Sequence, residues 1–356
     1  MQPPDPDQLG PAVAFDFTAK RAGINYDTIL SVVTRACAFS ILLMLAALLI
    51  VLSSAAMPTI KAFGFSFLTG HEWRSNELEQ PRRNADGKLV FDADGEQIVD
   101  TIPPVFGALP VMWGTAVTSV LALGFAIPLS FGTALFLIRI APGKLVGPVS
   151  FLVEFLAAIP SIAYGIWGLF VFGPFMQTYL EPWLNSLFGS VPGLSFLHFD
   201  GMPTGRDMLC GGLLLGIMIV PIITAISRDV LNGVPRAQVE GTTALGATWW
   251  QSSKEMLKFS RSGLFGAVML GLARAAGETM AITMVIGNNN QIKASPFAPA
   301  QSMASLLANE FAEASGGMQR SALIEVALIL LLMSLTFNVV ARKLVVGKGA
   351  RTAAAH

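Results

Sequence analysis

Long hydrophobic runs separated by polar segments dominate the chain. A bilayer core of about 30 Å requires roughly 20 consecutive apolar residues in a helix, and six runs meet this requirement. They cover approximately residues 33–57, 111–137, 148–173, 208–227, 263–287 and 321–346. This pattern predicts an all-α integral membrane protein with six transmembrane helices.

Composition agrees with this prediction. Of the 356 residues, 53% are hydrophobic and only 13% are charged, whereas soluble proteins carry about 25% charged residues. The first apolar run begins well after the polar stretch "MQPPDPDQLGP" and is longer than the apolar part of a signal peptide. We therefore expect the first run to be a retained transmembrane helix.

Basic residues between the runs predict the orientation, because Lys and Arg are enriched in cytoplasmic loops. With six helices, most basic residues fall on the side of both termini: Lys20, Arg21, Arg139, Lys144, Arg228, Arg236, Lys254, Lys258, Arg261, Arg342, Lys343, Lys348 and Arg351. The short opposite loops contain only Arg206, Lys293 and Arg320. We expect cytoplasmic tails at 1–30 and 349–356 and a transmembrane domain at 31–348, with an external loop at 58–110 and a cytoplasmic loop at 228–262.

The long external loop contains one short motif. In "KLVFDADGEQIV", residues 88–99, two apolar stretches flank an Asp-Gly pair that is typical of a β-hairpin turn. We expect a folded decoration there, and direct contact with a substrate is the less favoured alternative.

The fifth apolar run contains two charged residues, Arg274 and Glu278, within "LARAAGETMAITMVIGN". A charge in the middle of a bilayer costs about 2.5–3.5 kcal/mol on insertion scales, so it implies a partner or a function. A continuous helix would put both on one face, beside the small residues Ala267, Gly271 and Ala281. One interpretation is mutual neutralisation. The favoured interpretation is an anion path, because the Arg guanidinium binds oxyanions bidentately and Glu278 could orient it and limit its affinity.

The third run contains residues that interrupt helices: Pro160, Gly165 and Gly168, in "IPSIAYGIWG". Proline removes a backbone hydrogen bond and kinks a helix, and such breaks are tolerated where backbone lines a cavity or packs inside protein. Close helix packing through the two glycines is the slightly favoured alternative. Tyr164 could line the path, and Glu154 could be an interfacial charge or a contact to the core helices.

The cytoplasmic loop carries adjacent tryptophans, Trp249 and Trp250, in an otherwise polar segment. They could pack at the lipid interface or anchor a protein partner. The segment "EGTTALGATWWQSSKEMLKFS" resembles the EAA loop of ABC importer permeases, with Glu240 and Gly246 at the acidic and glycine positions. It departs from that pattern at Gly241, Thr242, Lys258 and Phe259. The resemblance implies two short coupling helices, joined at Gly246, that dock on a separate ATPase subunit.

Further stretches narrow the resemblance. "AAIPSIAYGIWGLF" (157–170), "IVPIITAISRDVLNGVP" (219–235) and "GLARAAGETMAITMVIGN" (271–288) resemble the PstC family, the permease subunits of phosphate-specific ABC transporters, and residues 106–138 agree with it. This implies a type I importer permease fold in a bacterial inner membrane. It also implies a PstA-like permease, two copies of a PstB-like ATPase and an external PstS-like phosphate-binding protein as partners. In this family the arginine and glutamate of "RAxGET" are taken to matter for phosphate passage.

Other functions stay open as alternatives. A permease for sulfate, molybdate or phosphonate would use the same arginine chemistry. An ion-coupled secondary transporter would use Arg274 and Glu278 as substrate and proton sites. An intramembrane enzyme would need a nucleophile with a base or a metal cluster, but His71, His198 and His356 are scattered, and Cys37 and Cys210 read as small buried side chains. We predict no catalytic residue, metal or cofactor, and no P-loop motif is present.

Overall fold

The computed structural model describes residues 26–75, 78–81, 99–190, 203–314 and 316–353. Residues 1–50 and 51–356 form two units, which are described separately. Helix α1 (Tyr26–Phe63) begins in the first unit and ends in the second. Most of the predicted N-terminal tail, the turn of the predicted external hairpin and the last three residues lie outside the described residues.

The second unit is largely helical. After α1 its helices are α2 (Ser66–Thr69), α3 (Leu109–Leu135), α4 (Gly143–Ala158), α5 (Ser161–Trp167), α6 (Gly173–Phe175), α7 (Glu181–Ser190), α8 (Met208–Asn232), α9 (Arg236–Ala244), α10 (Trp249–Phe259), α11 (Arg261–Ala276), α12 (Met280–Val285), α13 (Met303–Glu310) and α14 (Gly317–Ala353). Three π-helical turns continue them: η2 (Phe136–Ile140), η3 (Gly168–Phe172) and η4 (Met176–Leu180). Two short antiparallel pairs join β1 (Trp73–Arg74) to β4 (Val105–Phe106) and β2 (Leu78–Pro81) to β3 (Val99–Ile102).

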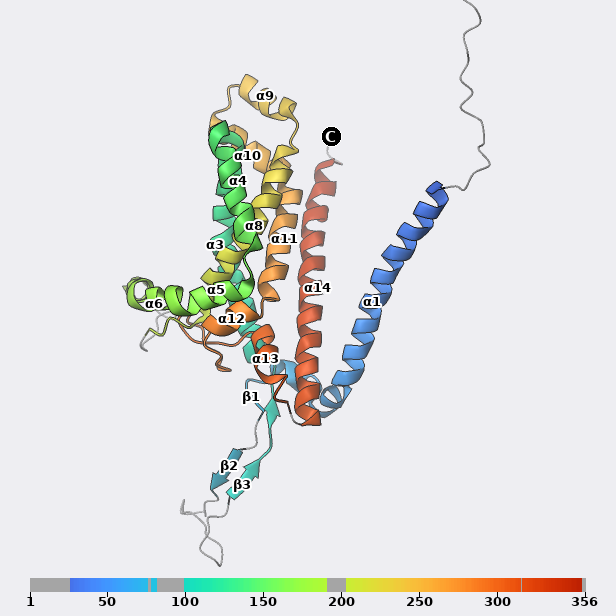
Figure 1. Ribbon diagram of the computed structural model, residues 1–356, viewed down its shortest axis with the longest axis vertical. Coiled ribbons are helices and arrows are strands. Elements are labelled where there is room, and N and C mark those ends of the chain that lie inside the picture. Colours follow the sequence, from blue (N-terminus) through green and yellow to red (C-terminus); the bar gives the residue numbers. More distant parts are fainter. Residues whose placement is uncertain (1–25, 76–77, 82–98, 191–202, 315, 354–356) are drawn as a thin grey trace, which may run out of the picture. The chain divides into compact units, whose positions relative to one another are not determined.

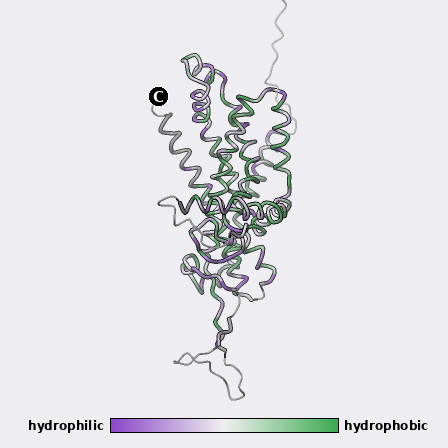
Figure 2. The backbone as a smooth tube through the Cα atoms, turned by 90° about the vertical axis from the view of Figure 1, so that its left-hand side faces the viewer, coloured by the Kyte–Doolittle hydropathy of each residue, from purple (hydrophilic) through white to green (hydrophobic). Residues whose placement is uncertain are grey.

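The core of this unit forms where α3 and α8 pack along each other, with α4 and α11 against α8 and α14 against α11 (Figure 1). Small residues allow the close approach. A Cβ at Gly212 would lie 2.6 Å from Leu121, and a Cβ at Gly216 would lie 2.8 Å from Phe125. Hydrophobic residues run along these helices, while hydrophilic residues gather in the segments beyond them (Figure 2).

Four helices in the described part of the chain are long and apolar enough to cross a membrane: Asp27–Phe63, Leu109–Ile140, Met208–Asn232 and Gly317–Val339. A fifth span exists if the bent pair Gly143–Ala158 and Ser161–Leu187 counts as one. The helical prediction is therefore confirmed, but the count of six is not. The helices also extend past the predicted boundaries, because hydropathy detects the apolar part and not the polar turns that prolong it.

The third predicted helix is not continuous from 148 to 173. It bends by 91° between α4 and α5, where Ile159 and Pro160 have extended backbone with ψ of 128° and 140°. Proline disfavours the helical conformation of the residue before it and donates no backbone hydrogen bond. The Tyr164 hydroxyl of α5 donates to the Leu156 carbonyl of α4 at 2.9 Å and so bridges the bend.

The expectation of one helix over 263–287 is wrong. Helix α11 ends at Ala276, and α12 begins only at Met280. At the break Gly277 has φ −95° and ψ 0°, and the Thr279 hydroxyl donates to the Gly277 carbonyl at 3.3 Å. A short polar side chain that bonds to nearby backbone competes with the helical pattern, and glycine adds little resistance.

Candidate functional site

The two helix breaks face each other in the fold, because α5 packs on α12. Gly165 makes this possible, since a Cβ there would lie 2.7 Å from the Met284 sulfur and 3.0 Å from the Ala281 Cα. Gly168 similarly packs against Leu214 and Val285. The third and fifth apolar runs therefore contribute their interrupted segments to one region, and Figure 1 shows α5 lying across the long helices there.

Arg274 lies in the last turn of α11, where a cation is favoured by the negative end of the helix dipole. Its side chain is exposed, and it acts electrostatically on the buried Tyr164. Glu278 is half-buried in the break, and no ion pair within 4.0 Å joins it to Arg274 in the described structure. The expected placement of both on one helical face, one turn apart, is thus corrected, since Glu278 lies outside the helix.

The small residues predicted beside Arg274 serve the packing of this chain. Ala267 is fully buried, and a Cβ on Gly271 would lie 2.6 Å from Ile223 of α8. Arg274 instead faces outward, as do Met280 of α12 and Ile162 of α5, which are 53% and 47% exposed. A closed path along this face therefore requires a second wall from outside this chain.

The loop predicted to be cytoplasmic contains two short helices, α9 and α10, joined at Gly246. This glycine has φ +82°, a conformation that other residues rarely adopt. Thr248 and Gln251 form a capping box at the start of α10. The Thr242 hydroxyl donates to Ser252 Oγ at 3.1 Å, and Arg139 donates to the same atom at 3.4 Å. The loop is therefore attached to the end of the second apolar run.

The outer face of this loop is apolar and exposed. Leu245, Trp249 and Trp250 are 91%, 45% and 61% exposed, and Glu240 is also exposed. The opposite side of α10 is buried through Ser252, Ser253 and Met256. Within the described structure the tryptophans thus form no part of the core, and Leu245 adds a third apolar side chain that sequence reasoning missed.

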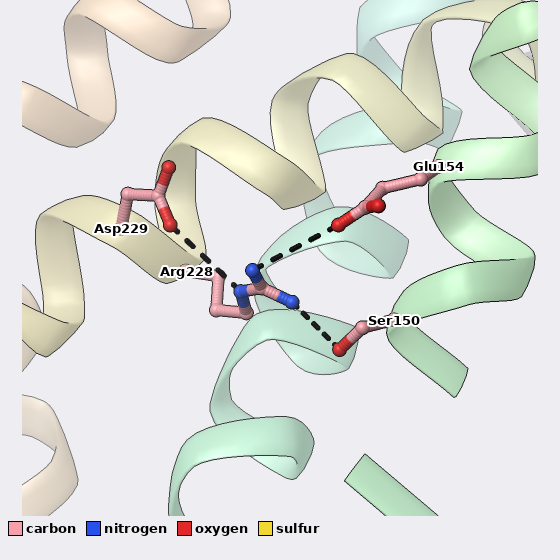
Figure 3. A network of polar contacts seen from close by, with 4 residues as sticks. All are labelled: Ser150, Glu154, Arg228 and Asp229. Atoms are coloured by element: carbon pink, nitrogen blue, oxygen red, sulfur yellow. Dashed lines mark hydrogen bonds and ion pairs between the residues drawn. The ribbon is translucent and has the colours of Figure 1, made fainter. Parts of the chain in front are cut away.

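Glu154 lies in a polar network at the end of α8 (Figure 3). Arg228 donates to Ser150 Oγ at 2.6 Å and lies 4.0 Å from a carboxylate oxygen of Glu154, both on α4. Its Nε lies 3.8 Å from Asp229. Glu154 thus lies within ion-pair distance of a core helix while its side chain stays 64% exposed, so the structure is compatible with both alternatives.

A buried carboxyl pair was missed by sequence reasoning. Asp207 is fully buried and caps α8, where its Oδ1 accepts from the Cys210 amide at 2.8 Å. Glu181 is also buried and accepts from the Gly205 amide at 3.3 Å. Burial, and then the charge of Glu181, raise the pKa of Asp207 to about 8. The two residues lie 26 positions apart, so the sequence carried no signal of their contact.

A buried glutamate and a pocket are two further features that were not among the predicted site residues. Glu325, within the span Gly317–Val339, is 6% exposed, and its Oε2 has no hydrogen-bond partner. A pocket of about 700 Å³ is lined by residues 71–73 and 289–293. In the described residues no group of three His, Cys, Asp or Glu side chains could hold a metal ion.

Comparison with known proteins gives consistent matches. A family model described as the binding-protein-dependent transport system inner membrane component matches residues 126–346. The phosphate transport system permease protein PstC of Mesorhizobium japonicum is 38% identical over 340 residues, covering 95% of each chain. The protein of the same name from Haemophilus influenzae is 42% identical over 309 residues, covering 86% of this chain and 89% of that one. A solved inward-facing conformation of the MetNI methionine ABC transporter aligns with 66% of this chain and 93% of that chain, at TM-score 0.49 and 17% identity.

Proposed function

Because the chain belongs to the family of binding-protein-dependent transport system inner membrane components, we propose that it is the permease subunit of an ATP-driven importer of inorganic phosphate. The observation that carries the proposal is the 38% identity to a phosphate permease over 95% of both chains. Similarity of this extent leaves no separate domain of the relative unmatched. An inner membrane location with several spans follows from the family and from the apolar helices.

The path for phosphate runs along the face that carries Arg274. The guanidinium is exposed, permanently charged and able to bind an oxyanion bidentately. Glu278 stands in the adjacent break, where its negative charge limits how tightly an anion is held. The second wall is a PstA-like permease, because this face is open in the single chain. Arg274 and Glu278 are thus substrate-path residues, and the path is complete only in the heterodimer.

Coupling to ATP takes place at the loop of α9 and α10. The exposed Leu245, Trp249 and Trp250 form the surface on which a PstB-like ATPase docks, and aromatic side chains are typical anchors of such interfaces. Glu240 and Gly246 belong to the same loop. The ATPase dimer hydrolyses ATP, so this chain needs no nucleotide site. Both termini and the loop lie in the cytoplasm, and a PstS-like protein delivers phosphate from outside.

A permease for another oxyanion is the second candidate, because an arginine fork also fits sulfate, molybdate or phosphonate. The test is uptake of labelled phosphate into vesicles that hold this chain with its PstA-, PstB- and PstS-like partners, with and without ATP. ATP-dependent uptake that excess sulfate and molybdate leave unchanged is expected. Uptake that needs no ATPase would instead indicate a secondary transporter, and ATP-driven uptake of a different anion would show that the substrate is wrong.

The role of Arg274 is tested in the same vesicles. Arg274→Ala should abolish uptake while the four kinds of subunit still assemble, and Arg274→Lys should restore only part of it, because lysine keeps the charge but lacks the fork. Arg206→Ala is the matched control, since Arg206 is an exposed arginine outside the helix breaks. Normal uptake in Arg274→Ala would refute the assignment.

A further inference from the structure

Besides its contact with Arg139, shortly before α4 begins, the coupling loop has two connections to the helix breaks. The first is the chain itself, because α10 continues through Ser260 into α11, which ends beside the break at Gly277. The second is less direct. Helix α8 ends at Asn232, just before α9, and one turn earlier Arg228 contacts α4 (Figure 3).

We infer that Arg228 is a positioning residue that transmits movement of the coupling loop through α4 to the break at α5. The inference rests on the proposed function, since it assumes that the loop of α9 and α10 is moved by an ATPase. It assigns a role in coupling to a side chain that does not contact the transported anion.

The contact between α8 and α4 is specific. Arg228 donates to Ser150 Oγ at 2.6 Å and lies 4.0 Å from Glu154, and these two residues are one turn apart on α4. The Arg228 guanidinium thus contacts two side chains that are separated by one full turn of α4. The Arg228 side chain is 27% exposed but the Glu154 side chain is 64% exposed. The hydrogen bond to Ser150, and not the solvent-screened ion pair, therefore holds the two helices together. Asp229, at 3.8 Å, holds the guanidinium from its own helix.

The two helices beyond this contact, α4 and α5, move together as one rigid element, which we call the lever. Helix α4 ends at Ala158 and meets α5 at 91°. The hydrogen bond from Tyr164 to the Leu156 carbonyl, at 2.9 Å, fixes the corner. Leu156 lies two residues after Glu154, so the corner and the Arg228 contact occupy adjacent turns of α4. A displacement applied at Arg228 is therefore carried into α5 instead of being lost at the bend.

At the other end of the lever, α5 packs on α12. Gly165 allows α5 to lie so close that any added Cβ would overlap Met284 and Ala281. Packed surfaces of this kind shift between discrete arrangements and do not deform continuously. The direct connection through α11 moves the side of the break that carries Arg274, and the lever moves the side formed by α5 and α12. Loss of Arg228 should leave the first movement intact and uncouple the second.

Transport and ATP hydrolysis in the assembled complex, reconstituted in vesicles, measure the consequence. Arg228→Gln should lower the phosphate imported per ATP hydrolysed by about fivefold or more, the usual scale of coupling between sites, with an unchanged KM for the loaded binding protein. Arg228→Lys should recover part of the ratio. The matched control is Arg74→Gln, because Arg74 is 17% exposed and pairs with Glu72 at 3.7 Å far from the loop. An unchanged ratio in Arg228→Gln, or an equal fall in Arg74→Gln, would overturn the inference.

A second readout does not depend on the substrate. Spin labels at the exposed positions Ile166 of α5 and Leu270 of α11, each paired with one at Val120 of α3, report the two movements separately. In a Cys37→Ser background, ATP should shift both distances in the native complex and only the Leu270 distance in Arg228→Gln. Equal shifts in both complexes would refute the lever. Absence of phosphate uptake alongside the expected distance changes would refute only the proposed substrate.

If the complex with Arg228→Gln does not assemble, two milder substitutions test the same inference. Ser150→Ala removes the 2.6 Å hydrogen bond, and Tyr164→Phe removes the bond across the corner. If the lever acts as one element, the double variant should lower the coupling ratio no further than the more severe single variant. Independent, multiplicative effects would show that the two contacts do not belong to one mechanical element.

Discussion

The buried carboxyl pair at the start of α8 makes stability depend on pH in a defined direction. Burial and the charge of Glu181 raise the pKa of Asp207 from its usual 3.8 to about 8. Between these two values the unfolded chain has released the proton that the folded protein retains. Stability therefore falls as pH rises from about 4 to about 8 and then levels off.

The magnitude follows from the size of the shift. One pKa unit corresponds to about 1.4 kcal/mol, so the free energy of unfolding should fall by about 4 kcal/mol between pH 5 and pH 8 through this group alone. Asp207→Asn should remove that slope. The amide oxygen can still accept from the Cys210 amide, as the carboxylate does at 2.8 Å, and the amide nitrogen can donate to Glu181.

The assay is reversible unfolding of the detergent-solubilised chain at several pH values, for the native protein and for Asp207→Asn. The difference between the two curves isolates the pair of Asp207 and Glu181 from the other titrating groups, and Glu313→Gln is the control, because Glu313 is exposed. The variant should be the more stable protein at pH 8 and should lose this advantage toward pH 5. Parallel curves for the two proteins would show that water reaches the pair and that it holds no extra proton.

Three further predictions concern glycines and the loop surface. Gly114→Ala should destabilise the protein by on the order of 2 kcal/mol in thermal unfolding, because a Cβ there would lie 2.2 Å from the Gln301 carbonyl oxygen. The control Gly124→Ala should leave thermal unfolding unchanged, because the space around Gly124 is open. Gly246→Ala should cost about 1–2 kcal/mol at φ +82° and make the link between α9 and α10 more sensitive to protease. Trp250→Ala should leave unfolding within about 0.5 kcal/mol but weaken binding of the ATPase by about tenfold, and unchanged affinity in a pull-down titration would contradict the docking surface.

The positions of the long helices could be predicted from the sequence because lipid-facing helices must be apolar over their whole length. Exposed apolar side chains such as Phe151, Phe155 and Val120 are the result. The helices α9 and α10 could also be anticipated, because the resemblance to the EAA loop implies two short helices joined at Gly246. Their docking role stays a prediction, because only a complex can test it.

The break at Gly277 could not be predicted in the same way. Its neighbours Ala275 and Ala276 are strong helix formers, and a single glycine in an apolar run costs only about 1 kcal/mol, which hydropathy does not register. The contact between Glu181 and Asp207 joins two distant segments, and the turn that aligns them depends on Gly205 at φ +65°. Such features follow from tertiary packing, which local pattern does not encode.

The two helix breaks together constrain what can cover the exposed face of Arg274. Within lipid, every backbone amide and carbonyl must be paired, so non-helical backbone at that depth has to face protein or water. At the fifth run the Glu278 amide has only a long bond, 3.4 Å from the Ala275 carbonyl, and Ile159 and Pro160 are extended at the third. Lipid cannot satisfy either segment. The face that carries Arg274 therefore needs a protein subunit or a water-filled path beside it, which is the requirement that a heterodimeric permease with an anion path between its halves would meet.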